Sequence, residues 1–299
     1  MDQKYPYFDE KNVDWNSIYG RYYSRTRNAS TEEYLQVFQE IIDSLRDGHV
    51  WLKAENTVLY YDSPVAEIDG YYTWFSNIYQ YGIATTQHNP EVDKCYSTLQ
   101  LKGDILYMQY YTSPKFHADT FEQLIKTYSY KNGIIIDVRL NGGGQEPVEL
   151  ISCFFNGVKT VRYEKHKKGK GHNDFTDYFP IQITGRGTID GNIPVVILTS
   201  KQTYSAANFF VADMKYLDNV TIIGTTTGGG GSPRQTYILP NGWIYASPCS
   251  RSYDIKYNSI ESGVTPHIEI VLTPEMKEEM RLTGIDPVFK AAYQYLLDK

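Results

Sequence analysis

The spacing of apolar residues near the start of the chain predicts a helix. Residues 28–31 include Asn, Ser and Thr side chains that can cap a helix, and Glu32 and Glu33 are typical of a first turn. Apolar side chains then recur at intervals of three and four, as in an amphipathic helix: Tyr34, Leu35, Phe38, Ile41, Ile42 and Leu45. We expect this helix to end near residues 47–48, because glycine is the usual residue just past a helix end.

From about residue 103 onwards, short apolar runs alternate with helical patterns. The apolar runs are typical of buried strands and cover residues 104–108, 133–138, 193–199 and 220–223. Helices are expected between or after them at residues 118–130, 147–155 and 206–215. This alternation favours an α/β core in which most strands pair in parallel.

The remaining segments have a different character. Aromatic runs at residues 58–61 and 71–75 predict antiparallel strands. Residues 164–175 are basic and contain glycine, which is typical of a mobile, solvated loop. We therefore divide the chain into a small helical N-terminal region, an aromatic-rich β connecting segment and an α/β core, at residues 1–52, 53–102 and 103–299.

Composition narrows the classes of function. The chain has 299 residues and a formal net charge of −6, so we do not expect nucleic acid as its main partner, because phosphate binding requires a basic face. No apolar run approaches the roughly 20 residues that span a bilayer, so we expect no stable membrane insertion. The widely spaced Cys95, Cys153 and Cys249 form no CxxC pair, and no HExxH motif is present, so neither a metal site nor a cofactor is implied.

Two loops at expected strand ends could carry chemistry. Residues 141–144 (NGGG) follow a buried strand, and their backbone N–H groups could bind an anion or a developing oxyanion, although a structural turn is equally consistent. Ser205 stands just before a helix rich in small residues, where acyl-transfer nucleophiles are found, but serine there is also a common helix cap. A serine nucleophile needs a base, and of the six histidines only His49 lies between a helix end and a strand. The residues alone therefore indicate a candidate hydrolase and go no further.

Several short segments add information through their order along the chain. They are residues 42–50 (IDSLRDGHV), 133–144 (GIIIDVRLNGGG), 194–208 with Tyr204-Ser205-Ala206-Ala207, 222–231 with glycine at 228–231, 261–266 (ESGVTP), and Asp286-Pro287 before a final helix. Together they resemble the C-terminal processing (tail-specific) serine peptidases, most closely the tricorn-protease-like branch. The resemblance covers residues 10–52 and 103–299.

This resemblance implies a fold and a set of roles. The fold would be a ClpP/crotonase-like α/β core preceded by a small helical region. Ser205 would be the nucleophile, His49 the general base and Glu261 the group that orients His49 or the hydroxyl network. Two backbone N–H groups would form the oxyanion hole: that of Gly143, or alternatively Gly144, and that of Ala206.

The chain departs from the family pattern in several places. The main branch places a catalytic lysine in the Gly-rich turn, where this chain has only residues 227–231 (TGGGG), so a Ser–Lys mechanism is disfavoured. Gly48 replaces a serine that often precedes the histidine, and His267 replaces the usual aspartate after GVTP. Residues 53–102 leave too little room for the PDZ domain that processing peptidases insert there, so the aromatic residues 58–81 become a candidate surface for substrate tails.

The expected function is hydrolysis of peptide bonds by a serine peptidase acting through an acyl-enzyme, on a peptide or protein substrate. A non-catalytic protein that binds peptide, carbohydrate or a hydrophobic ligand on the same fold remains an alternative. So does an esterase or acyl transferase with the same triad, and a coenzyme A enzyme of the crotonase type is a more distant one. A homo-oligomer is consistent with the sequence. The family resemblance also implies an extracytoplasmic location: periplasmic, at the surface or secreted.

Overall fold

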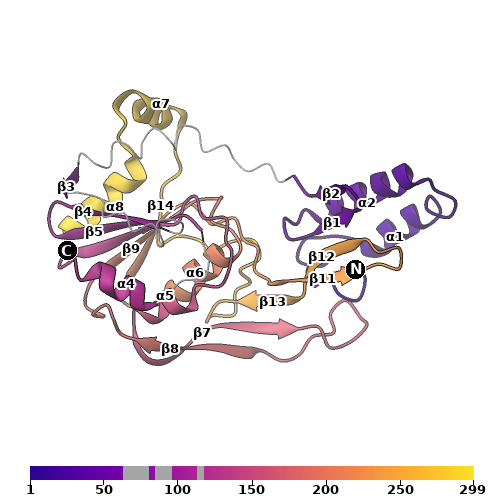
Figure 1. Cartoon of the computed structure of the whole chain (residues 1–299), viewed down its shortest axis with the longest axis horizontal. Helices are drawn as coiled ribbons and strands as arrows, with labels where there is room; N and C mark the ends of the chain where they lie inside the picture. Colours follow the sequence, from indigo (N-terminus) through magenta and orange to yellow (C-terminus); the bar gives the residue numbers. More distant parts are fainter. Residues whose placement is uncertain (63–80, 85–95, 113–117) are drawn as a thin grey trace. The chain divides into compact units, whose positions relative to one another are not determined.

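The computed structural model describes residues 1–62, 81–84, 96–112 and 118–299 (Figure 1). The chain forms two compact units. The smaller comprises Met1–Pro64, Tyr163–Phe179 and Gly230–Tyr253, and the larger comprises Val65–Arg162, Pro180–Gly229 and Asp254–Lys299. Each unit is therefore assembled from segments that lie far apart in the sequence.

The larger unit is built on a seven-stranded sheet of order β14-β10-β9-β6-β5-β4-β3. The strands β5, β6, β9, β10 and β14 pair in parallel, whereas β3 and β4 add antiparallel strands at one edge. Their bounds are β3 Gly82–Ala84, β4 Tyr96–Leu101, β5 Ile105–Tyr110, β6 Gly133–Asp137, β9 Val195–Thr199, β10 Val220–Gly224 and β14 Ile268–Glu269. The predicted α/β core with mostly parallel pairing is confirmed.

Helices cover both faces of this sheet. On one face lie α4 (Ala118–Ile125), α5 (Val148–Ser152) and α6 (Ala206–Met214), and on the other lies α8 (Pro287–Leu297) (Figure 1). Two apolar clusters fill the layers, one with Phe121, Leu150 and Phe210 and one with Val288 and Phe289. The central strands β6 and β9 are buried along their whole length, because both of their faces are covered.

Two helices of the larger unit are shorter than the sequence predicts. The helix expected over residues 118–130 ends at Ile125, and the one expected over residues 147–155 spans only Val148–Ser152. In both cases the chain tightens into bonds to the third preceding residue, from Tyr128 N–H to Ile125 and from Phe154 N–H to Ile151. Such bonds typically close the last turn of a helix, and the apolar residues beyond them still pack into the core.

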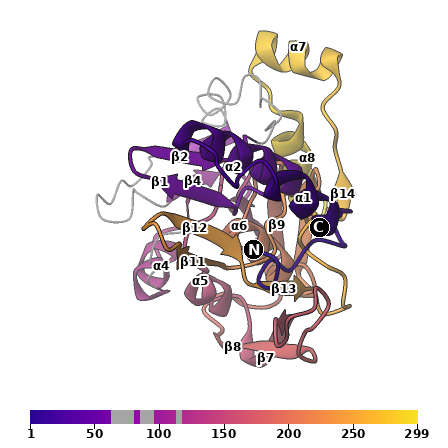
Figure 2. The same ribbon diagram turned by 90° about the vertical axis from the view of Figure 1, so that its right-hand side faces the viewer.

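The smaller unit holds a four-stranded antiparallel sheet of order β11-β12-β1-β2, with α1 and α2 beside it (Figure 2). The elements are α1 Trp15–Tyr23, α2 Thr31–Leu45, β1 Trp51–Ala54, β2 Thr57–Tyr60, β11 Arg234–Ile238 and β12 Ile244–Pro248. Ser30 and Glu33 form a capping box at the start of α2, as the sequence predicts. The helix ends before residues 47–48, because Arg46 adopts the left-handed conformation at φ 49° and ψ 48° and closes it.

The basic segment 164–175 differs from the mobile loop expected from its composition. Its first residues complete β7 (Asn156–His166), which pairs with β13 (Ser250–Tyr253), and Lys167 bridges to Phe175. The Asp174 carboxylate accepts the Gly171 N–H (2.8 Å) and so closes the turn. Phe175 is buried beneath the Arg251 guanidinium, 4.4 Å from the ring centre. The lysines therefore lie on a hairpin that is held by hydrogen bonds. The strand β8 (Phe179–Arg186) follows this hairpin.

Some expectations fall outside the described residues. These include the strand expected at residues 71–75 and most of the aromatic stretch 58–81. The division at residues 52 and 102 stays a prediction, because residues 63–80 and 85–95 are not described. Within the described part of the chain, no helix has both the length and the apolar character to cross a membrane.

Candidate active site

Ser205 occupies a strained turn between β9 and α6. It is the N-cap of α6, with φ 57° and ψ −123°, a conformation that residues with a side chain seldom adopt. Its N–H donates to the Gly229 carbonyl oxygen (2.9 Å), and its carbonyl accepts the Phe209 N–H (3.0 Å). The Ser205 side chain makes no capping bond to the helix, so the interpretation of this serine as a simple helix cap is wrong. Backbone strain of this kind clusters at functional sites.

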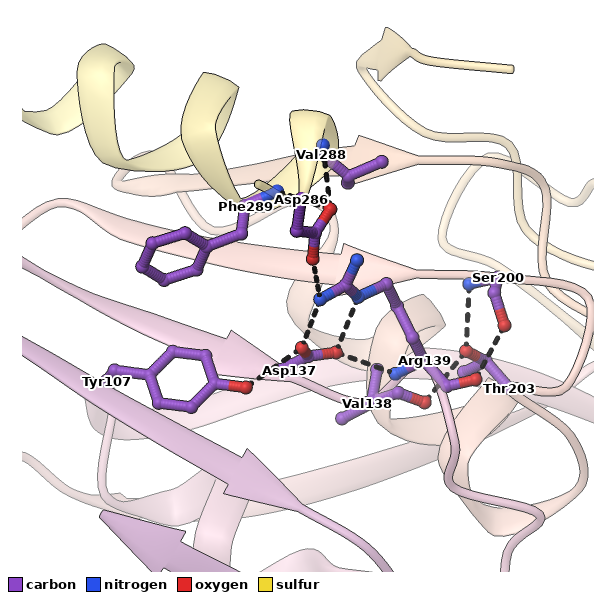
Figure 3. Close-up of polar contacts among 9 residues, drawn as sticks. All are labelled: Tyr107, Asp137, Val138, Arg139, Ser200, Thr203, Asp286, Val288 and Phe289. Carbon is purple, nitrogen blue, oxygen red and sulfur yellow. Dashed lines mark hydrogen bonds and ion pairs between the residues drawn. The ribbon is translucent and has the colours of Figure 1, made fainter. Parts of the chain in front are cut away.

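Hydrogen bonds join the loop after β9 to the glycine loop after β6. The Ser200 hydroxyl donates to the Arg139 carbonyl (2.5 Å) and the Thr203 hydroxyl to the Val138 carbonyl (2.9 Å) (Figure 3). The Tyr204 N–H then donates to the carbonyl of Asn141 (3.0 Å). The two loops thus bond to each other at successive positions, and this pairing brings residues 141–144 to Ser205.

Gly143 packs directly against the nucleophile candidate. A Cβ atom at Gly143 would lie 2.7 Å from the Ser205 Cβ and 2.9 Å from the Tyr204 carbonyl oxygen, and its φ of 104° also favours glycine. Its N–H donates to Asn141 Oδ1 (2.9 Å), and its carbonyl accepts the Thr112 hydroxyl (3.2 Å). Because the C=O and N–H of one peptide unit point in opposite directions, the Gly144 N–H points away from Thr112. The bond to Asn141 gives the Gly143 N–H an acceptor inside the loop, whereas the family resemblance made this N–H the first oxyanion donor.

Glu261 lies on the turn that supports the Ser205 backbone. A Cβ at Gly229 would meet the Glu261 carbonyl oxygen at 1.9 Å, so only glycine allows this approach. Asn208 of α6 holds the same turn, donating from Nδ2 to the Ile260 carbonyl (2.9 Å) and accepting the Thr227 hydroxyl (2.6 Å). The larger unit thus brings Glu261, with its buried side chain, Ser205 and Gly143 to one region.

A buried ion network holds the base of the glycine loop. Arg139 binds both carboxylate oxygens of Asp137 (2.9 and 2.6 Å) and also Asp286 (2.7 Å) (Figure 3). Asp286 caps α8 by accepting the Val288 N–H (2.9 Å), and the Tyr107 hydroxyl donates to Asp137 (3.0 Å). The network connects the end of β6 to the start of α8, so the C-terminal helix supports the loop that reaches Ser205.

We expect Arg139→Leu to lower the free energy of unfolding of the protein by about 3–5 kcal/mol, because two buried carboxylates lose their cation. Chemical denaturation followed by circular dichroism measures this. Arg281→Leu is the matched control: Arg281 pairs with Glu278 on the exposed face of α7 (Pro274–Thr283), where a loss of about 0.5 kcal/mol or less is expected. Equal losses in the two variants would contradict this assignment.

His49 belongs to the smaller unit, between α2 and β1. Asp47 fixes the turn: its Oδ1 accepts the His49 N–H (2.8 Å), and its Oδ2 accepts the Tyr5 hydroxyl (2.8 Å) and lies 3.1 Å from Lys11 Nζ. Burial is the main reason that the pKa of His49 is lowered from its ordinary value. Lys11 and Arg234 also lower it, whereas the Asp47 charge raises it. The imidazole is therefore neutral near neutral pH, as a general base must be.

Three other candidate bases in the described part of the chain have partners of their own. His267 Nδ1 accepts the Ile222 N–H (2.9 Å), and His172 Nε2 lies 2.6 Å from Asp2 Oδ1. Lys215 Nζ donates to the carbonyl and hydroxyl oxygens of Thr265 (2.9 and 3.1 Å). His88 and His117 lie outside the described residues. Within residues 1–62, 81–84, 96–112 and 118–299, no three His, Cys, Asp or Glu side chains are grouped to hold a metal ion.

Sequence reasoning missed several residues that build this region. The sequence assigned no individual role to Asp47, Asn141, Asn208 or Thr227, although each holds a backbone group near a candidate site residue. Asp47 and Asn141 each accept the N–H of the second residue after them, an arrangement typical of Asp and Asn in turns. That preference was the available signal for these two residues.

The model of peptidase family S41 matches residues 104–270 of the chain. The chain belongs to peptidase family S41. The match includes Ser205, Glu261 and the glycine loop, whereas His49 lies before it. The family resemblance inferred from the sequence is thereby confirmed.

Similar proteins are consistent with this family. The tricorn protease of Thermoplasma volcanium is 28% identical over 177 residues, which cover 57% of this chain but only 15% of that protein. A putative peptidase from Parabacteroides merdae has a solved structure that is 26% identical, with a TM-score of 0.83 over 99% of this chain and 93% of that one. A photosystem II D1 C-terminal processing protease, 13% identical, shares the fold alone, with a TM-score of 0.55 over 96% of this chain and 95% of that one.

Proposed function

We propose that this S41 family chain is a serine peptidase that hydrolyses peptide bonds through an acyl-enzyme on Ser205. The observation that carries the proposal is the strained conformation of Ser205 at the start of α6, with Gly143 packed against it. A strained strand-to-helix turn exposes a nucleophilic hydroxyl and aims nearby N–H groups at the reacting carbonyl.

In the proposed reaction, the Ser205 hydroxyl oxygen attacks the scissile carbonyl carbon while His49 Nε2 or Nδ1 takes the hydroxyl proton. His49 returns this proton to the leaving amine, which departs and leaves an ester on Ser205. Water then attacks the ester carbonyl carbon while His49 takes its proton; His49 returns this proton to the Ser205 oxygen as the ester C–O bond breaks, and the acid product leaves. The proposal requires His49 and Ser205 to meet in the active enzyme.

The oxyanion is stabilised by backbone donors. Ala206 is the first residue of α6, and the first N–H groups of a helix have no partner within it. Since the Gly143 N–H is bound to Asn141, we assign the loop's donor to Gly144 and give Gly143 the role of setting the loop against Ser205. A single such donor contributes about 3 kcal/mol to transition-state stabilisation.

Glu261 completes the proposed site as the orienting group. Its backbone supports Gly229, whose carbonyl holds the Ser205 N–H, and its side chain is buried. A buried carboxylate beside the nucleophile can fix the orientation of the base or of the hydroxyl network. We expect Glu261→Gln to lower kcat and to change KM much less.

The pH dependence of kcat/KM tests the role of His49. Only neutral His49 can accept a proton, so activity falls as pH drops through its pKa, which burial holds below the ordinary 6.5. Asp47→Asn removes a charge that raises this pKa, so the acid limb should move to lower pH. Lys11→Met removes a charge that lowers it, so the limb should move to higher pH. Identical limbs in both variants and the wild type would exclude His49 as the base.

Digestion of a peptide library, read by mass spectrometry, tests the proposed activity. We expect the wild type to cleave peptides, Ser205→Ala to be inactive, and the control Ser262→Ala to resemble the wild type, because Ser262 is exposed on the same turn as Glu261. Rapid turnover of simple esters without any peptide cleavage would favour the esterase alternative. No turnover of either substrate by folded protein would favour a binding protein.

A further inference from the structure

Arg162 is a fully buried cation outside the proposed triad. It lies on β7 and donates from Nη1 to Asp213 Oδ2 (2.6 Å) and from Nη2 to Glu146 Oε2 (2.7 Å). Its guanidinium also covers the ring of Phe209, 4.7 Å from the ring centre. Asp213 and Phe209 both belong to α6, the helix that begins at Ser205, so Arg162 is fixed to that helix by two contacts.

The glycine loop needs anchors from outside itself. Gly143 and Gly144 both have positive φ, and glycine backbones retain more conformational freedom than any other. The first half of the loop is held by the bonds from Tyr204 to Asn141 and from Thr112 to Gly143. In the second half, Gln145 is exposed and Pro147 caps α5 without any side-chain bond. Pro147 is buried, and the Glu146 side chain adds a charged contact to this half through its bond with Arg162.

We propose that Arg162 is a positioning residue that holds the oxyanion loop in register with the nucleophile helix, through Glu146 on the loop and Asp213 on α6. This inference rests on the proposed function. The Gly144 N–H and the Ala206 N–H must point at one oxygen atom, and the Arg162 clamp ties the segments that carry them to a single guanidinium. A displacement of about 1 Å in such a group costs about 100-fold in rate.

The charges separate this role from a purely structural one. Arg162 and Asp213, with side chains 2% and 0% exposed, already form a neutral buried pair. The side chain of Glu146 is 36% exposed, so charge balance does not require it, and partly exposed ion pairs add little to stability. The contact between Glu146 and Arg162 should therefore matter for the position of the loop more than for the stability of the fold.

The experiment compares Glu146→Gln with Glu122→Gln in the full chain. Glu122 is a matched control, because its side chain is 28% exposed and lies on α4, where it binds Arg186 Nε (2.9 Å) and accepts the Thr188 hydroxyl (2.7 Å). Five quantities are measured: kcat and KM for a cleaved peptide, the affinity of a peptide boronic acid, the melting temperature, and hydrogen–deuterium exchange of residues 141–147. A peptide boronic acid forms a tetrahedral adduct with the serine and so depends on the oxyanion hole.

We expect Glu146→Gln to lower kcat by about tenfold or more and boronic acid affinity in parallel, with KM and melting temperature unchanged and faster exchange in residues 141–147. Glu122→Gln should match the wild type in all five quantities. Arg162→Lys keeps the charge but cannot bond both carboxylates as a fork, so it should give a similar loss of kcat that does not add to that of Glu146→Gln.

Two outcomes overturn the clamp: unchanged kcat and exchange in Glu146→Gln, or a loss of kcat that follows only a loss of melting temperature. If the wild type neither cleaves peptides nor binds the boronic acid, the proposed function fails. Exchange in residues 141–147 then still decides whether Glu146 and Arg162 hold the loop.

Discussion

Ser205→Ala should lower kcat for peptide hydrolysis by about a million-fold, and His49→Ala should cost about as much. The nucleophile and its base act as a unit, so removing either abolishes the proton-coupled attack, and the double variant should be no slower than either single one. The residual rate then comes from substrate binding and the oxyanion donors. Single-turnover kinetics of the three variants, with Ser262→Ala as the control, measure this.

Other outcomes of this experiment would assign the chemistry differently. A near-wild-type rate for His49→Ala would point to another base, such as one of the two lysines that flank Ser205, Lys201 and Lys215. Additive losses in the double variant would mean that Ser205 and His49 act independently. The melting temperature of each variant shows whether the protein remains folded.

Gly143→Ala should reduce the rate of Ser205 acylation by about 100-fold to 1,000-fold, as the loss of an oxyanion donor does. The new Cβ would lie 2.7 Å from the Ser205 Cβ and 2.9 Å from the Tyr204 carbonyl oxygen, and alanine is strained at φ 104°. The loop must therefore move away from Ser205, taking the Gly144 N–H with it.

Gly142→Ala is the control in the same loop, because a Cβ there meets nothing within 4 Å and the residue needs no positive φ. We expect it to acylate at close to the wild-type rate. Burst kinetics with an activated ester separate acylation from later steps. If both variants lose the same activity, general disturbance of the loop explains the effect and the specific contact with Ser205 does not.

The patterns visible in the sequence predict the elements that carry the site. The apolar run ending at Asp137 and the glycines after it predict β6 and its loop, and the small residues after Ser205 predict α6. These features are local, since strand periodicity, glycine and helix-forming residues act over a few positions. The same reasoning places the end of α2 within about two residues, but it predicts α4 and α5 too long, since they end at Ile125 and Ser152.

Contacts between distant segments lie beyond local patterns. Arg139 meets Asp286, and Arg162 meets both Glu146 and Asp213, only because the sheet brings their elements together. The Gly143 N–H is taken by Asn141 through side-chain geometry, which composition does not reveal. For the same reason the sequence selects His49 by motif, but the direction of its pKa shift depends on burial in the folded protein.

The most direct test of a serine acyl-enzyme is the site of reaction with a fluorophosphonate probe. The folded protein is labelled, digested and mapped by tandem mass spectrometry, beside Ser205→Ala and Ser262→Ala. We predict one adduct, on Ser205, that is lost in Ser205→Ala and kept in Ser262→Ala. No adduct on folded wild-type protein, or an adduct on a different serine, would contradict the account.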